Sequence, residues 1–416
     1  MFLHHRQNNT VSAAINHRIP SPVLPEVPSP VLPEELIREI LLRLPVKSLL
    51  QLKCACKLWK TLISDSHFAK TNLQIRMNNP RLVFSDLETP YKIESYSLDS
   101  LFENSSSTPV EPITMSYVKK NKNCIIGSCN GLLCMYHSYK NVVRLGNPSI
   151  GFKSNKSPEA FSPDWMVVQY GFGYDQVNDK YKVLVVAQNK YDSSQLLTKI
   201  YIFGENFWKT IPNFSFRPTG RLGKFASGTL NWVVYKIGVS SDQNQNVIFS
   251  FDLEKETSRE ILLPETNVDN WSFTQRMLYV LSDCLCVCKC DRFGAVWLMK
   301  EYGVVDSWTK LMSIPQKHIH NEFSPIEPLF ISKRSVLFLK TMYSKVSICD
   351  SNDSRSQTSF AEPLFFFKNG SLALGEKPSS QLFIYSSNSG RVESLITSTL
   401  GSNLHIYHES LVSPQW

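Results

Sequence analysis

Four cysteines alternate along one short stretch of the chain, at Cys284, Cys286, Cys288 and Cys290. Thiolates are ligands that zinc prefers, but zinc sites usually take their ligands in two close pairs from turns. On a strand, the four side chains would point to one face and spread over about 20 Å, so they cannot converge on one ion. The pattern therefore predicts a packed strand of the core rather than a metal centre.

Two other patterns resemble reactive sites. His318 and His320 form a pair that we expect to lie in a surface loop rather than on a metal. Cys129 precedes Asn130-Gly131, but no phased histidine and acid accompany it, as a catalytic thiol requires, and Asn-Gly is typical of a tight hairpin turn. Since no phosphate-binding glycine loop or Ser/His/Asp arrangement occurs either, we predict no catalytic residue, cofactor or metal.

The composition of the 416 residues is that of a globular protein, with 42% hydrophobic and 19% charged residues. The net charge of +8 is scattered, with no Lys/Arg block longer than a dipeptide, which favours an ordinary surface over a nucleic-acid-binding face. No apolar run reaches 18 residues and no signal-peptide core is present, so we expect no membrane span. Ten cysteines without a secretion signal predict reduced thiols and a location in the cytoplasm, the nucleus or both.

The chain divides into a tail, a helical segment and a strand-rich remainder. Residues 1–31 are polar and then proline-rich, with SPVLPE present twice, and predict a disordered tail; a polyproline recognition peptide is the alternative. In 32–73, apolar residues recur at helical spacing between proline and serine stops. We expect Ser64–Ser66 to end this run and to cap one last turn at 68–69. So small a unit has a limited core, and its surplus apolar surface indicates a protein partner; the alternative is that all of it closes a local core.

Beyond about residue 80 the pattern changes to period two. Short runs bounded by turn signals predict strands at 81–84, 91–96, 142–145, 181–186, 199–203, 247–251, 296–300, 336–338 and 382–385. A weak repeat recurs roughly every 45 residues, a spacing typical of propeller blades. Its copies are 201–212, 251–264, 297–315 and 384–395. We interpret five of the eight tryptophans as blade plugs rather than as a sugar-stacking platform; they are Trp208, Trp232, Trp271, Trp297 and Trp308.

Several ordered motifs make the chain resemble a known family. Residues 32–73 resemble the F-box, with a leading Leu-Pro, a central LPVKSLL and a Cys-x-Cys-Lys-x-Trp ending. Downstream, IIGSCNGLLC, YGFGYDQVNDKYKVLVV, FSFDLEKETSREILLPE, LSDCLCV and VWLMKEYGVVDSWTKL look like the F-box-associated domain of plant F-box proteins. The terminal YHESLVSP is similar to the way that group ends. Gly146 replaces the aromatic residue usual before Asn-Pro, and Gln51 replaces a common arginine.

The resemblance implies a small all-α F-box at 32–73 followed by an all-β kelch-like propeller of six or seven blades at 74–412. It also implies the substrate-recognition subunit of a Skp1-cullin-F-box ubiquitin ligase, which is not itself a catalyst. The F-box would bind a Skp1-like adaptor and, through it, the cullin and RING subunits, and propeller loops at one rim would hold an unidentified protein substrate. The expected adaptor-binding residues are Leu32, Pro33, Leu36, Ile40, Leu41, Leu44, Pro45, Leu49, Leu52, Trp59 and Leu62.

Three other functions remain open from the sequence. A scaffold that uses the same two modules outside any ligase would bind the adaptor without cullin. A propeller enzyme or lectin would need a polar central pocket, for which few candidate ligands exist. A nucleic-acid-binding protein would present a single basic face and bind with a steep salt dependence.

Overall fold

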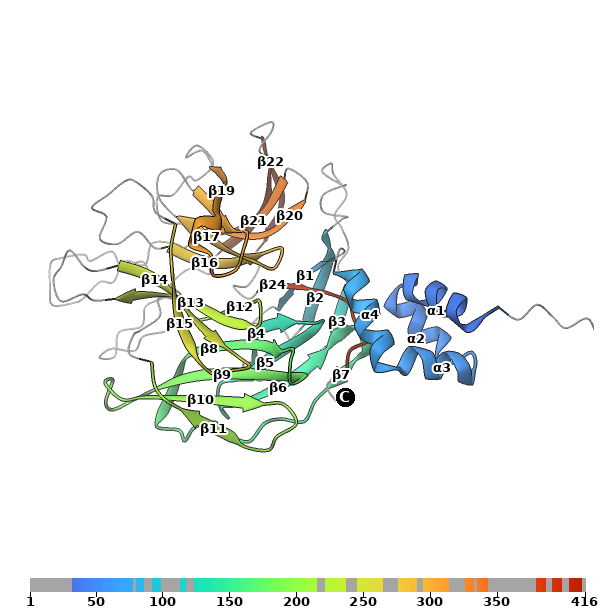
Figure 1. Cartoon of the computed structure of the whole chain (residues 1–416), viewed down its shortest axis with the longest axis horizontal. Coiled ribbons are helices and arrows are strands. Elements are labelled where there is room, and N and C mark those ends of the chain that lie inside the picture. Colours follow the sequence, from blue (N-terminus) through green and yellow to red (C-terminus); the bar gives the residue numbers. More distant parts are fainter. Residues whose placement is uncertain are drawn as a thin grey trace, which may run out of the picture.

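The computed structural model describes residues 32–77, 80–85, 92–98, 113–116, 123–214, 221–236, 245–264, 276–289, 295–313, 326–332, 335–342, 379–386, 391–398 and 404–413. Four helices come first in the chain and β-strands follow (Figure 1). The helices form a small body at one end, with α4 nearest the strands. Within the described residues, no helix is both long and apolar enough to cross a membrane.

Prolines and an aspartate set the limits of the helices. Leu44 leaves α1 in an extended conformation, and Pro45 then precedes the first turn of α2, where its missing N–H is harmless. The side chain of Asp65 accepts a hydrogen bond from the N–H of Phe68 at 2.8 Å and so caps α4. The expectation of a single last turn was wrong, because this cap begins an eleven-residue helix. The helices are α1 (Glu34–Arg43), α2 (Val46–Leu52), α3 (Lys57–Ser64) and α4 (Ser66–Arg76).

The described strands form six antiparallel sheets of four. From first to fourth strand, the first sheet is β24 (Leu404–Tyr407), β1 (Arg81–Ser85), β2 (Lys92–Ser97) and β3 (Ile113–Ser116). The second is β4 (Asn123–Cys129), β5 (Leu132–His137), β6 (Val142–Asn147) and β7 (Phe152–Lys153). The third is β8 (Trp165–Asp175), β9 (Lys180–Asn189), β10 (Leu196–Ile202) and β11 (Trp208–Ile211).

The remaining three sheets follow the same order along the chain. The fourth is β12 (Lys224–Ala226), β13 (Thr229–Lys236), β14 (Gln245–Asp252) and β15 (Ser258–Leu262). The fifth is β16 (Arg276–Leu281), β17 (Cys284–Lys289), β18 (Ala295–Met299) and β19 (Trp308–Ser313). The sixth is β20 (Ile326–Ser332), β21 (Ser335–Met342), β22 (Ser379–Ser386) and β23 (Arg391–Ser398).

The first strands of successive sheets contact one another in a closed ring, and β24 contacts both β20 and β4. This is the arrangement of a β-propeller, in which the last strand of the chain completes the first sheet and leaves no open edge between the ends. The four repeat copies of the sequence coincide with the third and fourth strands of the third to sixth sheets. The predicted repeat is therefore the outer hairpin of a blade.

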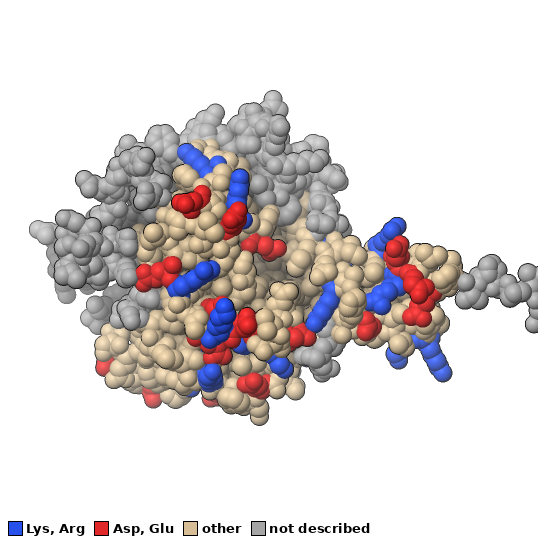
Figure 2. Space-filling model, in the orientation of Figure 1, with Lys and Arg blue, Asp and Glu red and all other residues tan. Residues whose placement is uncertain are grey.

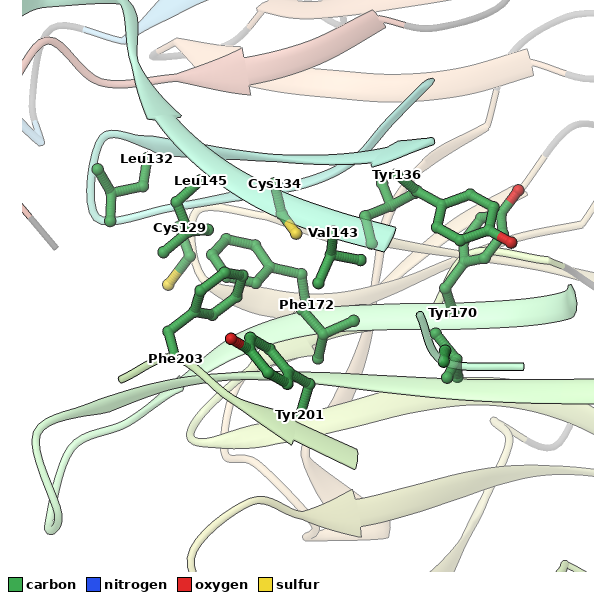
Figure 3. Close-up of a cluster of buried hydrophobic side chains, with 14 of the residues drawn as sticks. Cys129, Leu132, Cys134, Tyr136, Val143, Leu145, Tyr170, Phe172, Tyr201 and Phe203 are labelled. Carbon is green, nitrogen blue, oxygen red and sulfur yellow. The ribbon is translucent and has the colours of Figure 1, made fainter. Parts of the chain in front are cut away.

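The core lies between adjacent sheets. In the layer between the second and third sheets, side chains from β5 and β6 face Phe172 of β8 and Tyr201 of β10 (Figure 3). Trp232 is buried between the third and fourth sheets, which fits the plug interpretation. Trp208, Trp297 and Trp308 are half-buried, and Trp271 lies outside the described residues.

The cysteine stretch is a central strand. Cys286 and Cys288 of β17 are buried in a cluster of the fifth sheet, while Leu285 and Val287 face the fourth sheet. Burial raises the pKa of Cys286 to about 12, so its thiol stays protonated. The prediction of a packed core strand is confirmed for this pair; Cys290, like the pair His318 and His320, lies outside the described residues.

The Asn-Gly turn predicted from the sequence is present. Asn130 and Gly131 have φ values of 51° and 71° and join β4 to β5, which confirms the hairpin turn. Cys129 beside them is buried, and burial raises the pKa of its thiol. At the next hairpin, the side chain of Asp175 accepts a hydrogen bond from the N–H of Asn178 at 3.0 Å and so stabilises the β8–β9 turn.

Candidate functional site

An exposed apolar stripe runs along α1, the helix farthest along the chain from the propeller. Leu36 and Ile40 are one helical turn apart and remain 48% and 52% exposed, and Leu32 just before the helix is 54% exposed. On α3, Leu58 is 45% exposed. Large apolar side chains that stay half open on so small a unit are typical of a surface that a partner covers.

The structure divides the predicted adaptor-binding residues into two groups. Leu41, Leu49 and Leu62 are buried within the chain, where they pack with Ile63 and Phe68, so we assign them to its own core. Half-buried members border that core; they are Leu44, Leu52 and Trp59. Exposed members remain available to a partner; they are Leu32, Pro33, Leu36, Ile40 and Pro45.

Leu58 is absent from the predicted set. On α3, the predicted adaptor-binding set contained Trp59 and Leu62 but not Leu58, which lies one helical turn before Leu62. Its exposure is the signal that distinguishes it, and exposure is a tertiary property. Its role in binding, like that of the exposed members of the predicted set, stays a prediction.

Charged side chains of both signs lie on the surface of the helical body (Figure 2). On α1, Arg43 pairs with Glu39 at 3.5 Å, and both are well exposed. Arg38 lies near Asp65 at 3.8 Å and over the ring of Phe68, where it ties α1 to the start of α4. These exposed pairs contribute little to stability but would form a polar rim around an apolar contact.

The helices are seated on one face of the propeller. Leu73 of α4 packs into the core between the second and third sheets, and Leu411 and Ile150 of the strand-rich part pack into the helical core. Lys70 of α4 also pairs with Asp179, in the β8–β9 turn, at 2.9 Å. The propeller therefore covers part of the apolar surface of the helical segment, and only the rest remains exposed for a partner to cover.

Three separate sequence motifs meet where the helices contact the propeller; they are Asn147-Pro148, Asn130-Gly131 and the terminal YHESLVSP. Asn147 is fully buried and donates from its amide to the carbonyls of Ser410 and Val412, at 2.9 and 2.8 Å. Tyr407 donates to the amide oxygen of Asn147 at 3.1 Å. A Cβ on Gly131 would lie 2.3 Å from the Ser410 hydroxyl, so the Asn-Gly turn is also pressed against this segment. Sequence reasoning treated these motifs separately, because nothing in their spacing relates them.

A buried ion pair within the third sheet lies on the same face and also reaches the fourth sheet through a hydrogen bond. Lys182 pairs with Asp175 at 2.9 Å, with both side chains nearly inaccessible, and donates to the carbonyl of Leu253 at 2.5 Å. Burial by itself raises the pKa of Asp175, but hydrogen bonds from Asn178 and the contact with Lys182 outweigh it and leave the pKa lowered. The carboxylate is thus held ionised inside the propeller.

Comparison with known proteins agrees with this architecture. Residues 30–71 match the family model of the F-box domain, and residues 87–389 match that of the F-box associated beta propeller domain. Neither is the model of an enzyme family. The second match alone spans more than half of the chain.

Curated relatives from Arabidopsis thaliana match over most of their length. An F-box/kelch-repeat protein is 34% identical over 323 residues, which cover 74% of this chain and 84% of that protein. F-box protein CPR1 is 30% identical over 325 residues, covering 72% and 76%. A putative F-box protein is 26% identical over 363 residues, covering 82% and 74%. From its two modules and these matches, the chain belongs to the plant F-box proteins that carry an F-box associated beta propeller domain.

Proposed function

We propose that the chain is the substrate-recognition subunit of a Skp1-cullin-F-box ubiquitin ligase. The observation that carries the proposal is the exposed stripe of Leu36 and Ile40 on a segment that matches the F-box. Packing within the chain leaves about half of the surface of each of these two side chains exposed to solvent. Apolar side chains at positions i and i+4 of a helix are the contacts that an apolar groove on a helical adaptor would bind. In this proposal, the Skp1-like adaptor covers Leu32, Leu36 and Ile40 and brings the cullin and RING subunits.

The propeller would hold the protein to be modified. We infer that the six described sheets are its six blades. The F-box touches the face that carries the first-to-second-strand turns, through Lys70 and Asp179. Because antiparallel strands place alternate connections at opposite ends, the second-to-third-strand connections lie on the far face. Tyr139 and Tyr191, which are 70% and 84% exposed, lie in two of these connections, and we propose the far face for the target.

The chain itself would supply proximity rather than chemistry. Ubiquitin transfer would take place at the RING subunit and its charged conjugating enzyme, and the propeller would raise the effective concentration of a target lysine there. In this role the protein would act in the cytoplasm, the nucleus or both.

Affinity purification of the full chain from plant cells tests the proposal. We expect both a Skp1-like adaptor and a cullin to copurify with the wild type, and neither with the Leu36→Asp/Ile40→Asp variant. Ile75→Asp on α4 is the matched control, since Ile75 is also 48% exposed but lies off the stripe. Adaptor without cullin would indicate a scaffold outside the ligase. Absence of adaptor from the wild type would refute the assignment.

The same variant identifies the target. A receptor that cannot reach the ligase still binds its substrate, so the Leu36→Asp/Ile40→Asp protein should retain proteins that wild-type cells degrade. Quantitative mass spectrometry compares the two purifications. A protein enriched on the variant, and stabilised in cells that express it, is the expected result.

A further inference from the structure

Two adjacent residues near the end of the chain pack into two different modules. Leu411 is 4% exposed and belongs to the apolar core of the F-box helices. Val412 is 3% exposed and belongs to the propeller core between the second and third sheets. Successive side chains of an extended segment point to opposite sides, which is how one short segment serves both cores. In Figure 1 this part of the chain lies between α4 and the strands.

The segment is held on the propeller side by buried hydrogen bonds. Asn147 donates to the carbonyls on either side of Leu411, and the N–H of Ser410 donates to the Ser149 hydroxyl at 3.2 Å. Ser149 lies in the short helix η1 (Pro148–Ile150), which itself contacts α2. The bonds fix the backbone of residues 410–412, and Leu411 then projects from this fixed backbone into the helical core.

We propose that residues 408–413 are a positioning element that fixes the orientation of the F-box on the propeller. The chain connection to β1 attaches α4 to the propeller, and so do Leu73 in the propeller core and the ion pair of Lys70 with Asp179. From distant parts of the sequence, Leu411 and Ile150 add a separate attachment to the shared core of the four helices, and this attachment limits their rotation relative to the propeller. The inference rests on the proposed function only for its consequence, which is that the bound target is held at a set distance from the conjugating enzyme.

Distance measurements on the full chain test the proposal. Spin labels are placed through unnatural amino acids at Lys47 on α2 and Tyr191 on the propeller, both exposed. We expect a single narrow distance distribution for the wild type and at least a twofold broader one for Leu411→Ala. The control is Leu263→Ala, since Leu263 is 5% exposed in the core between the fourth and fifth sheets. Its thermal midpoint should fall while the distribution stays narrow.

Further variants separate positioning from general loss of structure. Leu411→Met keeps the volume of the side chain and should retain the narrow distribution. Lys70→Ala removes only an exposed ion pair across the same boundary and should also leave it narrow. If Leu411→Ala does not fold, Leu411→Val takes its place, and broadening is expected in the same direction. Unchanged width in every folded Leu411 variant, or equal broadening in Leu263→Ala, would overturn the proposal.

A second readout concerns the ligase. In a reconstituted reaction with a Skp1-like adaptor, cullin and RING subunits, a fixed F-box should confine ubiquitin to a small set of lysines on the chain itself. Leu411→Ala should spread modification over at least twice as many lysines, with adaptor affinity changed less than twofold. No modification of the wild type would count against the proposed function, whereas the spin-label result would still decide the positioning role.

Discussion

The exposed stripe on α1 leads to a quantitative expectation for adaptor binding. Burying a leucine or isoleucine side chain completely is worth about 1.5 to 3 kcal/mol. Since Leu36 and Ile40 are 48% and 52% exposed, a partner can still remove about half of each from water, or about 1 kcal/mol per residue. The Leu36→Ala/Ile40→Ala double variant should therefore weaken adaptor binding by about 2 kcal/mol, roughly 30-fold in Kd.

Isothermal titration calorimetry with a purified Skp1-like adaptor measures this loss. Ile75→Ala removes an isoleucine of equal exposure, 48%, from α4 and should change Kd less than twofold. Neither variant should shift the thermal midpoint by more than a few degrees, because half-exposed side chains contribute little to the core. Unchanged affinity in the double variant, or an equal loss in Ile75→Ala, would refute the assignment of this stripe to the adaptor.

Three further predictions concern the propeller. Asn147→Ala removes buried hydrogen bonds and should lower the free energy of unfolding by about 2 kcal/mol in urea titrations; a loss below 0.5 kcal/mol would contradict the importance of these bonds. Lys182→Met leaves Asp175 buried without its partner and should cost about 3 to 5 kcal/mol, against less than about 1 kcal/mol for the exposed Lys209→Met control. Burial and a nearby lysine lower the pKa of His405 to about 4, so the fold keeps its ring neutral. In the unfolded chain, His405 takes up a proton as the pH falls below about 6.5, whereas in the folded chain it does so only near its lowered pKa. The free energy of unfolding should therefore decrease by about 2 kcal/mol between pH 7 and pH 5. His405→Gln should lessen that decrease; an equal pH dependence in both proteins would show that another group is responsible.

Much of the fold was predictable because it depends on residues that are close together in the sequence. Pro33 and Pro45 limit the first helix, alternating apolar residues define the strands, and Asn130-Gly131 forms the turn that its residue types require. The extent of α4 was not predictable from the same signals. Ser64–Ser66 resemble a stop, but Asp65 in that stretch caps a new helix, and a stop and a start use the same residue types.

Periodicity and turn residues act over a few positions, so the amino-acid sequence alone was enough to predict an F-box-like helical segment followed by a repeated β array. It could not determine which apolar residues face a partner, since Leu41 and Ile40 are neighbours of equal hydrophobicity and only packing buries one and leaves the other exposed. Nor could it relate Asn147 to Ser410, which are 263 positions apart and meet only because β24 closes the ring. The surface that contacts the F-box therefore forms only when the propeller closes, and no single segment of the sequence predicts it.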